Sequence, residues 1–138
     1  MSCTETDVVT AKLIDDSDRL IALPTHFPHF YSITENAIYA CLGSLCEEYT
    51  GGFWDFFELS NGGFYMAPKT DKKFHITCSG NFFDDTVSAD AAGIIACLHA
   101  YSHLSFQTQD DNIADAFHQL REFADSHAEG QLIFAAID

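Results

Sequence analysis

Residues 48–68 read Glu48-Tyr-Thr-Gly-Gly-Phe-Trp-Asp-Phe-Phe-Glu-Leu-Ser-Asn-Gly-Gly-Phe-Tyr-Met-Ala-Pro68. This segment holds four of the eight glycines, the only tryptophan and seven aromatic residues, a density that favours a sheet core. The pair Asn61-Gly62 favours a two-residue type I′ turn, because these two residue types tolerate positive φ. The segment is therefore predicted to form the central β-hairpin.

A two-residue turn also predicts the register of the hairpin. It would place Phe57 opposite Met66 and Phe56 opposite Ala67, and opposed residues share one face of a sheet. One face would then be wholly apolar, with Phe57, Leu59, Phe64 and Met66. The other would be mixed, with Trp54, Phe56, Glu58, Tyr65 and Ala67.

Helices and one further strand are predicted around the hairpin from the spacing of apolar residues. The β-branched, alternating residues 74–78 predict a third strand beside the hairpin, followed by a loop over 79–87, which Phe82 and Phe83 could extend as sheet. The predicted helices cover residues 14–23, ended by Pro24; 34–46, capped by Thr34; 89–106, capped by Ser88; a segment capped by Asn112; and a last segment after a capping box at Ser126–Glu129.

These elements predict an α+β protein made of a single domain over residues 1–138. A small antiparallel sheet of three to four strands, built on the Asn-Gly hairpin, would pack against about four to five helices. The helix over 89–106 is apolar on nearly every side, so it is expected to lie buried across the sheet. Residues 1–12 are mainly polar and are expected to be disordered.

The composition limits the classes of partner. With 21 acidic and 6 basic residues the formal net charge is −15, which opposes direct binding to nucleic acid or to an anionic membrane. Five cysteines, an odd number without a Cys-x-x-Cys pair, favour reduced thiols in a cytoplasmic protein. No export signal or membrane anchor is predicted. The sequence does not decide the oligomeric state.

Catalytic and metal-binding patterns are weak. His99 and His103 have the spacing of two zinc ligands on a helix, yet no third ligand stands near them in a known motif. Glu58, on the mixed sheet face, could have its pKa raised by burial, although a carboxylate at the rim is the simpler interpretation. We therefore expect no enzyme activity, cofactor or metal. A small metal-dependent or carboxylate-based hydrolase is the alternative.

Several segments together resemble the ArdB/KlcA antirestriction family. They are Tyr49-Thr-Gly-Gly-Phe-Trp54, Leu59-Ser-Asn-Gly-Gly-Phe-Tyr-Met-Ala-Pro68, Ser88-Ala-Asp-Ala-Ala-Gly-Ile94, Phe123-Ala124, His127-Ala-Glu129 and Ala136-Ile-Asp138. The resemblance spans nearly the whole chain after Pro24, and His99 and His103 are not part of it. It implies an α+β protein of bacterial plasmids and other mobile elements that relieves type I restriction of incoming DNA, without catalysis.

The resemblance implies the type I restriction-modification complex as the partner, through direct or indirect contact. The acidic surplus leaves DNA mimicry possible but unsupported, because the acids are spread along the chain. A shaped surface with aromatic anchors is the preferred mechanism. The expected partner-binding residues are Tyr49, Trp54, Phe56, Glu58 and Tyr65. The alternative is that the helix over 89–106 already covers these rings.

Overall fold

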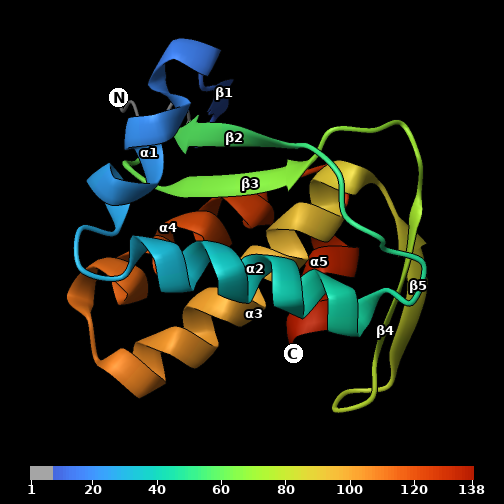
Figure 1. Cartoon of the computed structure of the whole chain (residues 1–138). Coiled ribbons are helices and arrows are strands. Elements are labelled where there is room, and N and C mark those ends of the chain that lie inside the picture. Colours follow the sequence, from blue (N-terminus) through green and yellow to red (C-terminus); the bar gives the residue numbers. More distant parts are fainter. Residues whose placement is uncertain (1–7) are drawn as a thin grey trace, which may run out of the picture.

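The computed structural model describes residues 8–138 and has the predicted α+β fold (Figure 1). Its elements follow the order β1 (Ala11–Leu13), the 3-10 turn η2 (Asp16–Asp18), α1 (Arg19–His26), α2 (Tyr31–Leu45), β2 (Trp54–Leu59), β3 (Phe64–Pro68), β4 (Phe74–Cys78), β5 (Phe83–Val87), α3 (Ala89–Thr108), α4 (Asp111–Asp125) and α5 (Gly130–Ile137). The strands form two antiparallel sheets, β1-β2-β3 and β4-β5. The fold class is thus confirmed, with the strands divided between two sheets.

The central hairpin is present, but its predicted two-residue turn is wrong. The Leu59 N–H donates to the Gly63 carbonyl at 2.9 Å and the Gly62 N–H to the Leu59 carbonyl at 3.0 Å, so the loop has three residues. Gly62 has φ +93°, whereas Asn61 does not enter the positive region. This is a type I turn followed by a left-handed glycine, the next most common hairpin geometry. The Asn61 amide is engaged elsewhere, donating to the Gln119 carbonyl of α4 at 3.0 Å.

The extra loop residue shifts the register by one. Phe57 lies opposite Tyr65, and Phe56 opposite Met66. Because a one-residue shift exchanges the two faces of a strand, the predicted faces are corrected. One face carries Trp54, Phe56, Glu58, Phe64 and Met66, and the other carries Asp55, Phe57, Leu59, Tyr65 and Ala67.

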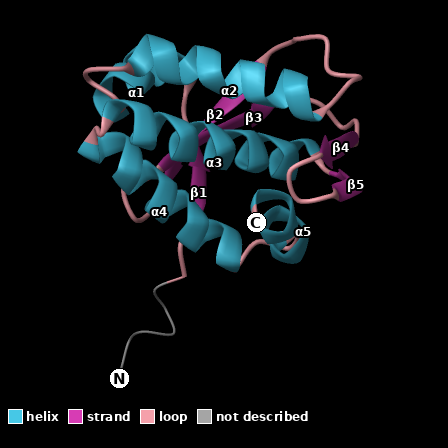
Figure 2. Cartoon of the chain, turned by 90° about the horizontal axis from the view of Figure 1, so that it is seen from below, coloured by secondary structure: helices cyan, strands magenta, loops and turns pink. Residues whose placement is uncertain are grey.

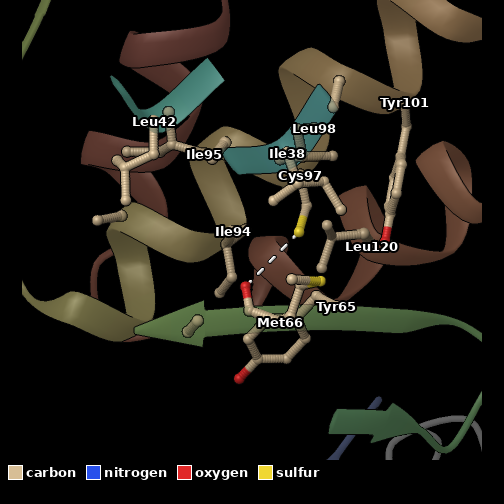
Figure 3. Close-up of a cluster of buried hydrophobic side chains, with 14 of the residues drawn as sticks. Ile38, Leu42, Tyr65, Met66, Ile94, Ile95, Cys97, Leu98, Tyr101 and Leu120 are labelled. Carbon is tan, nitrogen blue, oxygen red and sulfur yellow. Dashed lines mark hydrogen bonds between the residues drawn. The ribbon is translucent and has the colours of Figure 1, made fainter. Parts of the chain in front are cut away.

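Helix α3 lies between α2 and α4 and forms the centre of the core (Figure 2). It runs along the edge of β3 that β2 leaves open. There the Tyr101 hydroxyl donates to the Phe64 carbonyl at 2.7 Å and the Cys97 thiol to the Met66 carbonyl at 3.6 Å (Figure 3). A Cβ on Gly93 would lie 2.5 Å from the Cα of Ala67, so only glycine permits this approach. Side chains of α3 thus bind carbonyl groups on a strand edge that could otherwise pair with another chain.

The third strand of the main sheet comes from the N-terminal part of the chain. Ala11 pairs with Leu59 and Leu13 with Phe57, so the expected disorder is wrong for Ala11 and Lys12, while residues 1–7 lie outside the described part. The segment 74–78 is a strand as predicted, but β5 pairs with it in place of the hairpin. The expected loop over 79–87 is therefore mostly β5. Alternation along the chain predicts a strand but does not identify its neighbour.

The predicted helix ends need several corrections. Ser88 caps α3 as expected, accepting from the Ala91 N–H at 3.1 Å. Helix α2 begins at Tyr31, one turn before Thr34, and the buried Thr34 hydroxyl has no hydrogen-bond partner among the described residues. Pro24 lies inside α1, which continues to His26. Asp110, two residues before Asn112, caps α4.

Candidate functional site

The five residues expected to bind a partner do not form one exposed face. Trp54, Phe56 and Tyr65 are buried, with 2%, 5% and 2% of their surface exposed. Tyr49 is half-buried and Glu58 is exposed. The three aromatic rings are covered, as in the alternative. The expected helix, α3, contacts Tyr65 through Asp90, whereas residues of α1 and α2 contact Phe56 and Trp54.

Trp54 and Phe56 pack beneath the first two helices. Tyr39 of α2 meets the Trp54 ring edge to face at 5.2 Å, and the indole N–H donates to the Tyr49 hydroxyl at 3.0 Å. The Arg19 guanidinium of α1 lies 4.2 Å from the centre of the Phe56 ring, a cation–π contact. These contacts make Trp54 and Phe56 part of the core.

Tyr65 belongs to the opposite sheet face and lies in a polar cluster. Its ring stacks on Phe57 at 4.7 Å and on Phe123 of α4 at 5.6 Å. Its hydroxyl donates to Asp90 in the first turn of α3 at 2.7 Å, and His127 contacts the other Asp90 oxygen at 2.8 Å. The cluster joins three elements that are distant in sequence.

The hydrogen bonds assign the protons in this cluster. The Glu129 N–H donates to Nδ1 of His127 at 2.9 Å, so Nε2 carries the proton that faces Asp90. Burial alone would raise the pKa of Asp90, but hydrogen bonds from His127 and Tyr65 outweigh it and hold that pKa below its usual range. Burial and the neighbouring Asp90 charge raise the pKa of Tyr65 well above its usual range. The Tyr65 hydroxyl is therefore a hydrogen-bond donor that stays protonated.

Glu129 also binds the start of α3, through Ser88. Its carboxylate accepts from the Ser88 N–H at 3.1 Å and from the Ser88 hydroxyl. The predicted capping box is thus wrong, because Glu129 binds the N-cap residue of α3 and the Ser126 N–H donates to the Phe123 carbonyl. The contacts tie the start of α3 to the connection between α4 and α5. Their geometry explains local structure without requiring catalysis.

Sequence reasoning missed the partners in this cluster. Asp90 and His127 are 37 residues apart, and so no spacing rule relates them. A signal was present in the family motifs, since Ser88-Ala-Asp90 and His127-Ala-Glu129 are two of the segments that carry the resemblance. The structure shows that these segments contact each other.

Glu58 lies at a different site, on the surface beside α1. His26 contacts its carboxylate at 2.5 Å, and both residues line a hollow of about 310 Å³ between α1 and the edge of the main sheet. The alternative of a hydrolase has no support here, because the His26 and Glu58 side chains bind each other. The Thr25 hydroxyl, which also lines the hollow, donates to the Ile21 carbonyl at 2.6 Å.

His99 and His103 are separated in environment. Nε2 of His99 contacts the Ala136 carbonyl at 3.2 Å, and burial lowers the pKa of this histidine. His103 is exposed. Within residues 8–138, no three His, Cys, Asp or Glu side chains are placed to hold a metal ion. In the same range no helix is long and apolar enough to cross a membrane.

Comparison with known proteins places this fold among the antirestriction proteins. The solved structure of the KlcA and ArdB proteins matches it with a TM-score of 0.88 and 43% identity, over 94% of this chain and 95% of that one. Those proteins are reported to show a novel fold and antirestriction activity against type I DNA restriction systems in vivo but not in vitro. The fold in which α3 lies between α2 and α4 is therefore the KlcA/ArdB fold.

The sequence matches agree. The pattern of the family described as "Antirestriction protein" covers residues 47–138. Antirestriction protein KlcA of Escherichia coli is 42% identical over 140 residues, covering 98% of this chain and 99% of the relative, and a second KlcA from E. coli is 44% identical over 94% of each. The uncharacterised protein YfjX of E. coli K12 is 37% identical over 91% of this chain. The chain belongs to the antirestriction protein family.

Proposed function

We propose that this protein relieves type I restriction of incoming DNA inside a bacterial cell, as a single-domain, non-catalytic interaction protein. The observation that carries the proposal is the full-length likeness to KlcA, in sequence and in fold, since the KlcA and ArdB proteins have this activity in vivo. The natural setting is the cytoplasm of a host that has received a plasmid or another mobile element.

We further propose that the protein acts through a cellular component absent from a purified restriction reaction. The KlcA and ArdB proteins act against type I systems in vivo but not in vitro. A direct inhibitor of the assembled enzyme should act in both settings, because its affinity would not depend on the cell. The activity in cells alone supports an indirect effect on the restriction complex.

The placement of the acids supports a mechanism other than DNA mimicry. A mimic needs many free carboxylates arranged like phosphates along a duplex. Here many carboxylates bind partners within the protein. These include Glu35 with Tyr39, Glu58 with His26, Asp84 with His75, Asp90 with Tyr65 and His127, Asp110 with the start of α4, Glu122 with Asn61, and Glu129 with Ser88.

Phage plating tests the proposal. Unmodified phage is plated on a strain with an active type I system, with and without the expressed protein, and on an isogenic strain that lacks the restriction subunit. We expect higher plating efficiency in the restricting strain when the protein is present, and no change in the strain without restriction. Equal efficiencies in the restricting strain, with soluble folded protein confirmed in the cells, would refute the function.

A further inference from the structure

Helix α1 carries large apolar side chains that the fold leaves in water. Leu20 is 90% exposed, Ile21 is 61% exposed and Leu13 of the neighbouring β1 is 51% exposed. Burying a leucine or isoleucine side chain stabilises a protein or a complex, and these residues remain largely exposed in the isolated chain. Exposed apolar side chains gathered at one place mark contact sites.

The surface at α1 is hollowed on both sides of the helix. The hollow of about 310 Å³ lies between α1 and the strands β1 and β2, and both apolar and charged side chains line it. A second hollow of about 320 Å³ lies toward α2. The apolar residues that line them are Leu13, Ile14, Ile21 and Ala22 in the first, and Leu20, Leu23, Pro24, Tyr31 and Phe56 in the second.

The rim of this surface is acidic. Asp15 and Asp18 line the first hollow together with Glu58, which is paired with His26, and Glu35, which accepts from Tyr39, lines the second. Two bases are close, Lys12 and Arg19, but the Arg19 guanidinium is already placed over the Phe53 and Phe56 rings at 4.4 and 4.2 Å. The excess of carboxylates favours a positively charged partner.

The charge also selects among classes of partner. DNA and anionic lipid would be repelled by a chain of net charge −15, and so would a second copy of the same chain. An amphipathic polypeptide segment with lysines or arginines beside an apolar residue fits both features: its cations would meet the rim and its apolar side chain would enter a hollow.

We propose that the α1 surface, defined by Leu13, Leu20, Ile21, Asp15, Asp18 and Glu58, binds a basic amphipathic segment of a cellular protein. The inference rests on the proposed function, because it supplies the contact surface through which an interaction protein would act. Figure 1 shows α1 at the opposite end of the molecule from the β4–β5 hairpin. A partner at α1 would therefore leave that hairpin free.

Surface variants test the apolar part of the inference. Leu20→Ser with Ile21→Ser removes two exposed apolar side chains, and Phe106→Ser is the matched control because Phe106 is 81% exposed near the end of α3. In the plating assay we expect the double variant to lose tenfold or more of its protection and the control to keep it. Circular dichroism and equal melting temperatures confirm the fold.

Charge reversal tests the polar part. Asp15→Lys with Asp18→Lys reverses the rim, and neither carboxylate makes a side-chain cap hydrogen bond. Asp115→Lys with Asp125→Lys, both exposed on α4, makes the same change in net charge elsewhere. Protection should fall only for the first pair. An equal fall for both pairs would overturn the inference, because net charge and not this surface would then decide activity.

Photo-crosslinking identifies the occupant. The photoreactive residue p-benzoylphenylalanine is incorporated into the protein at position 20, or at position 106 as a control, and the protein is expressed in restricting cells. We expect a crosslink from position 20 to a Lys/Arg-rich segment of another protein, lost when Asp15 and Asp18 are reversed. A crosslink to a second copy of this chain, or to a segment insensitive to the reversal, would overturn the inference.

The outcomes separate the inference from the proposed function. If the unaltered protein fails to protect phage, the proposed function fails. If the unaltered protein protects and the Leu20/Ile21 variant protects equally, the function stands and the α1 surface is not its contact site.

Discussion

At the scale of single residues, Gly93 determines how closely α3 approaches β3. Gly93→Ala would place a methyl group 2.5 Å from the backbone of Ala67 and from the Met66 carbonyl oxygen, neither of which can move away easily. We expect a loss of about 1–3 kcal/mol in the free energy of unfolding, measured with urea. Gly43→Ala in α2 is the control, because a Cβ there meets nothing within 4 Å, and should gain about 0.5–1 kcal/mol. Equal effects would refute the packing argument.

Asp90 gives the stability of the protein a pH dependence. Its pKa is lowered in the folded state, so its contribution is present above the unfolded pKa and is lost as pH falls through the folded one. Asp90→Asn should therefore destabilise the protein near pH 7, and the difference from the unaltered protein should shrink toward pH 3. Urea unfolding at several pH values measures this. Asp115→Asn, exposed on α4, should show no such pattern.

Trp54 is assigned to the core by its burial. Trp54→Ala should cost about 3–5 kcal/mol and abolish antirestriction by unfolding the protein, which circular dichroism would show. Phe53→Ala is a close control, since Phe53 is 55% exposed, and should cost about 1 kcal/mol or less. Native circular dichroism with lost activity in Trp54→Ala would return this residue to a binding role.

The amino-acid pattern around Trp54 predicts a strand, but it does not predict which elements pack over that strand. Alternation places Trp54 and Phe56 on one side of β2, and that much is confirmed. Whether water or a helix meets that side depends on Tyr39 and Arg19, which lie 15 and more residues away in sequence. The same limit applies to Asp90 and His127, which become neighbours only through the fold.

At the scale of elements, the hairpin turn depends on one glycine. Gly62→Val would place a β-branched residue at φ +93°, at a cost of about 1–3 kcal/mol. Gly80→Val serves as the control, because Gly80 lies in the other hairpin turn with open space around it and no positive φ. Thermal unfolding compares the two, and an unchanged melting temperature for Gly62→Val would contradict the claim.

The type of most elements could be predicted, while their ends and pairings could not. The apolar residues of α3 and α4 recur at helical spacing, and both helices are found close to their predicted ranges. The predicted register of the hairpin is wrong because the Asn61 side chain binds Gln119 of α4, a contact that favours a three-residue loop. The sequence did not predict that β4 pairs with β5, because the alternation of apolar and polar residues does not identify the adjacent strand.

At the scale of the whole molecule, the net charge of −15 need not act as an imitation of DNA. Asp110→Asn with Asp111→Asn removes two adjacent charges, while asparagine preserves the cap that Asp110 makes with the Ile113 N–H. We expect phage protection within about twofold of the unaltered protein, which is less than 1 kcal/mol in an equilibrium. A large, salt-dependent loss of activity with an intact fold would favour mimicry.

The thiol at the junction of α3 and β3 has a use beyond packing. Burial raises the pKa of Cys97 to about 12, and its Sγ faces the Met66 carbonyl with no exposed surface. Because the thiolate is the nucleophile that attacks an alkylating reagent, Cys97 can react only after the helix has separated from the strand. The rate of its modification in living cells would therefore time how often the core opens, and would do so without purifying the protein.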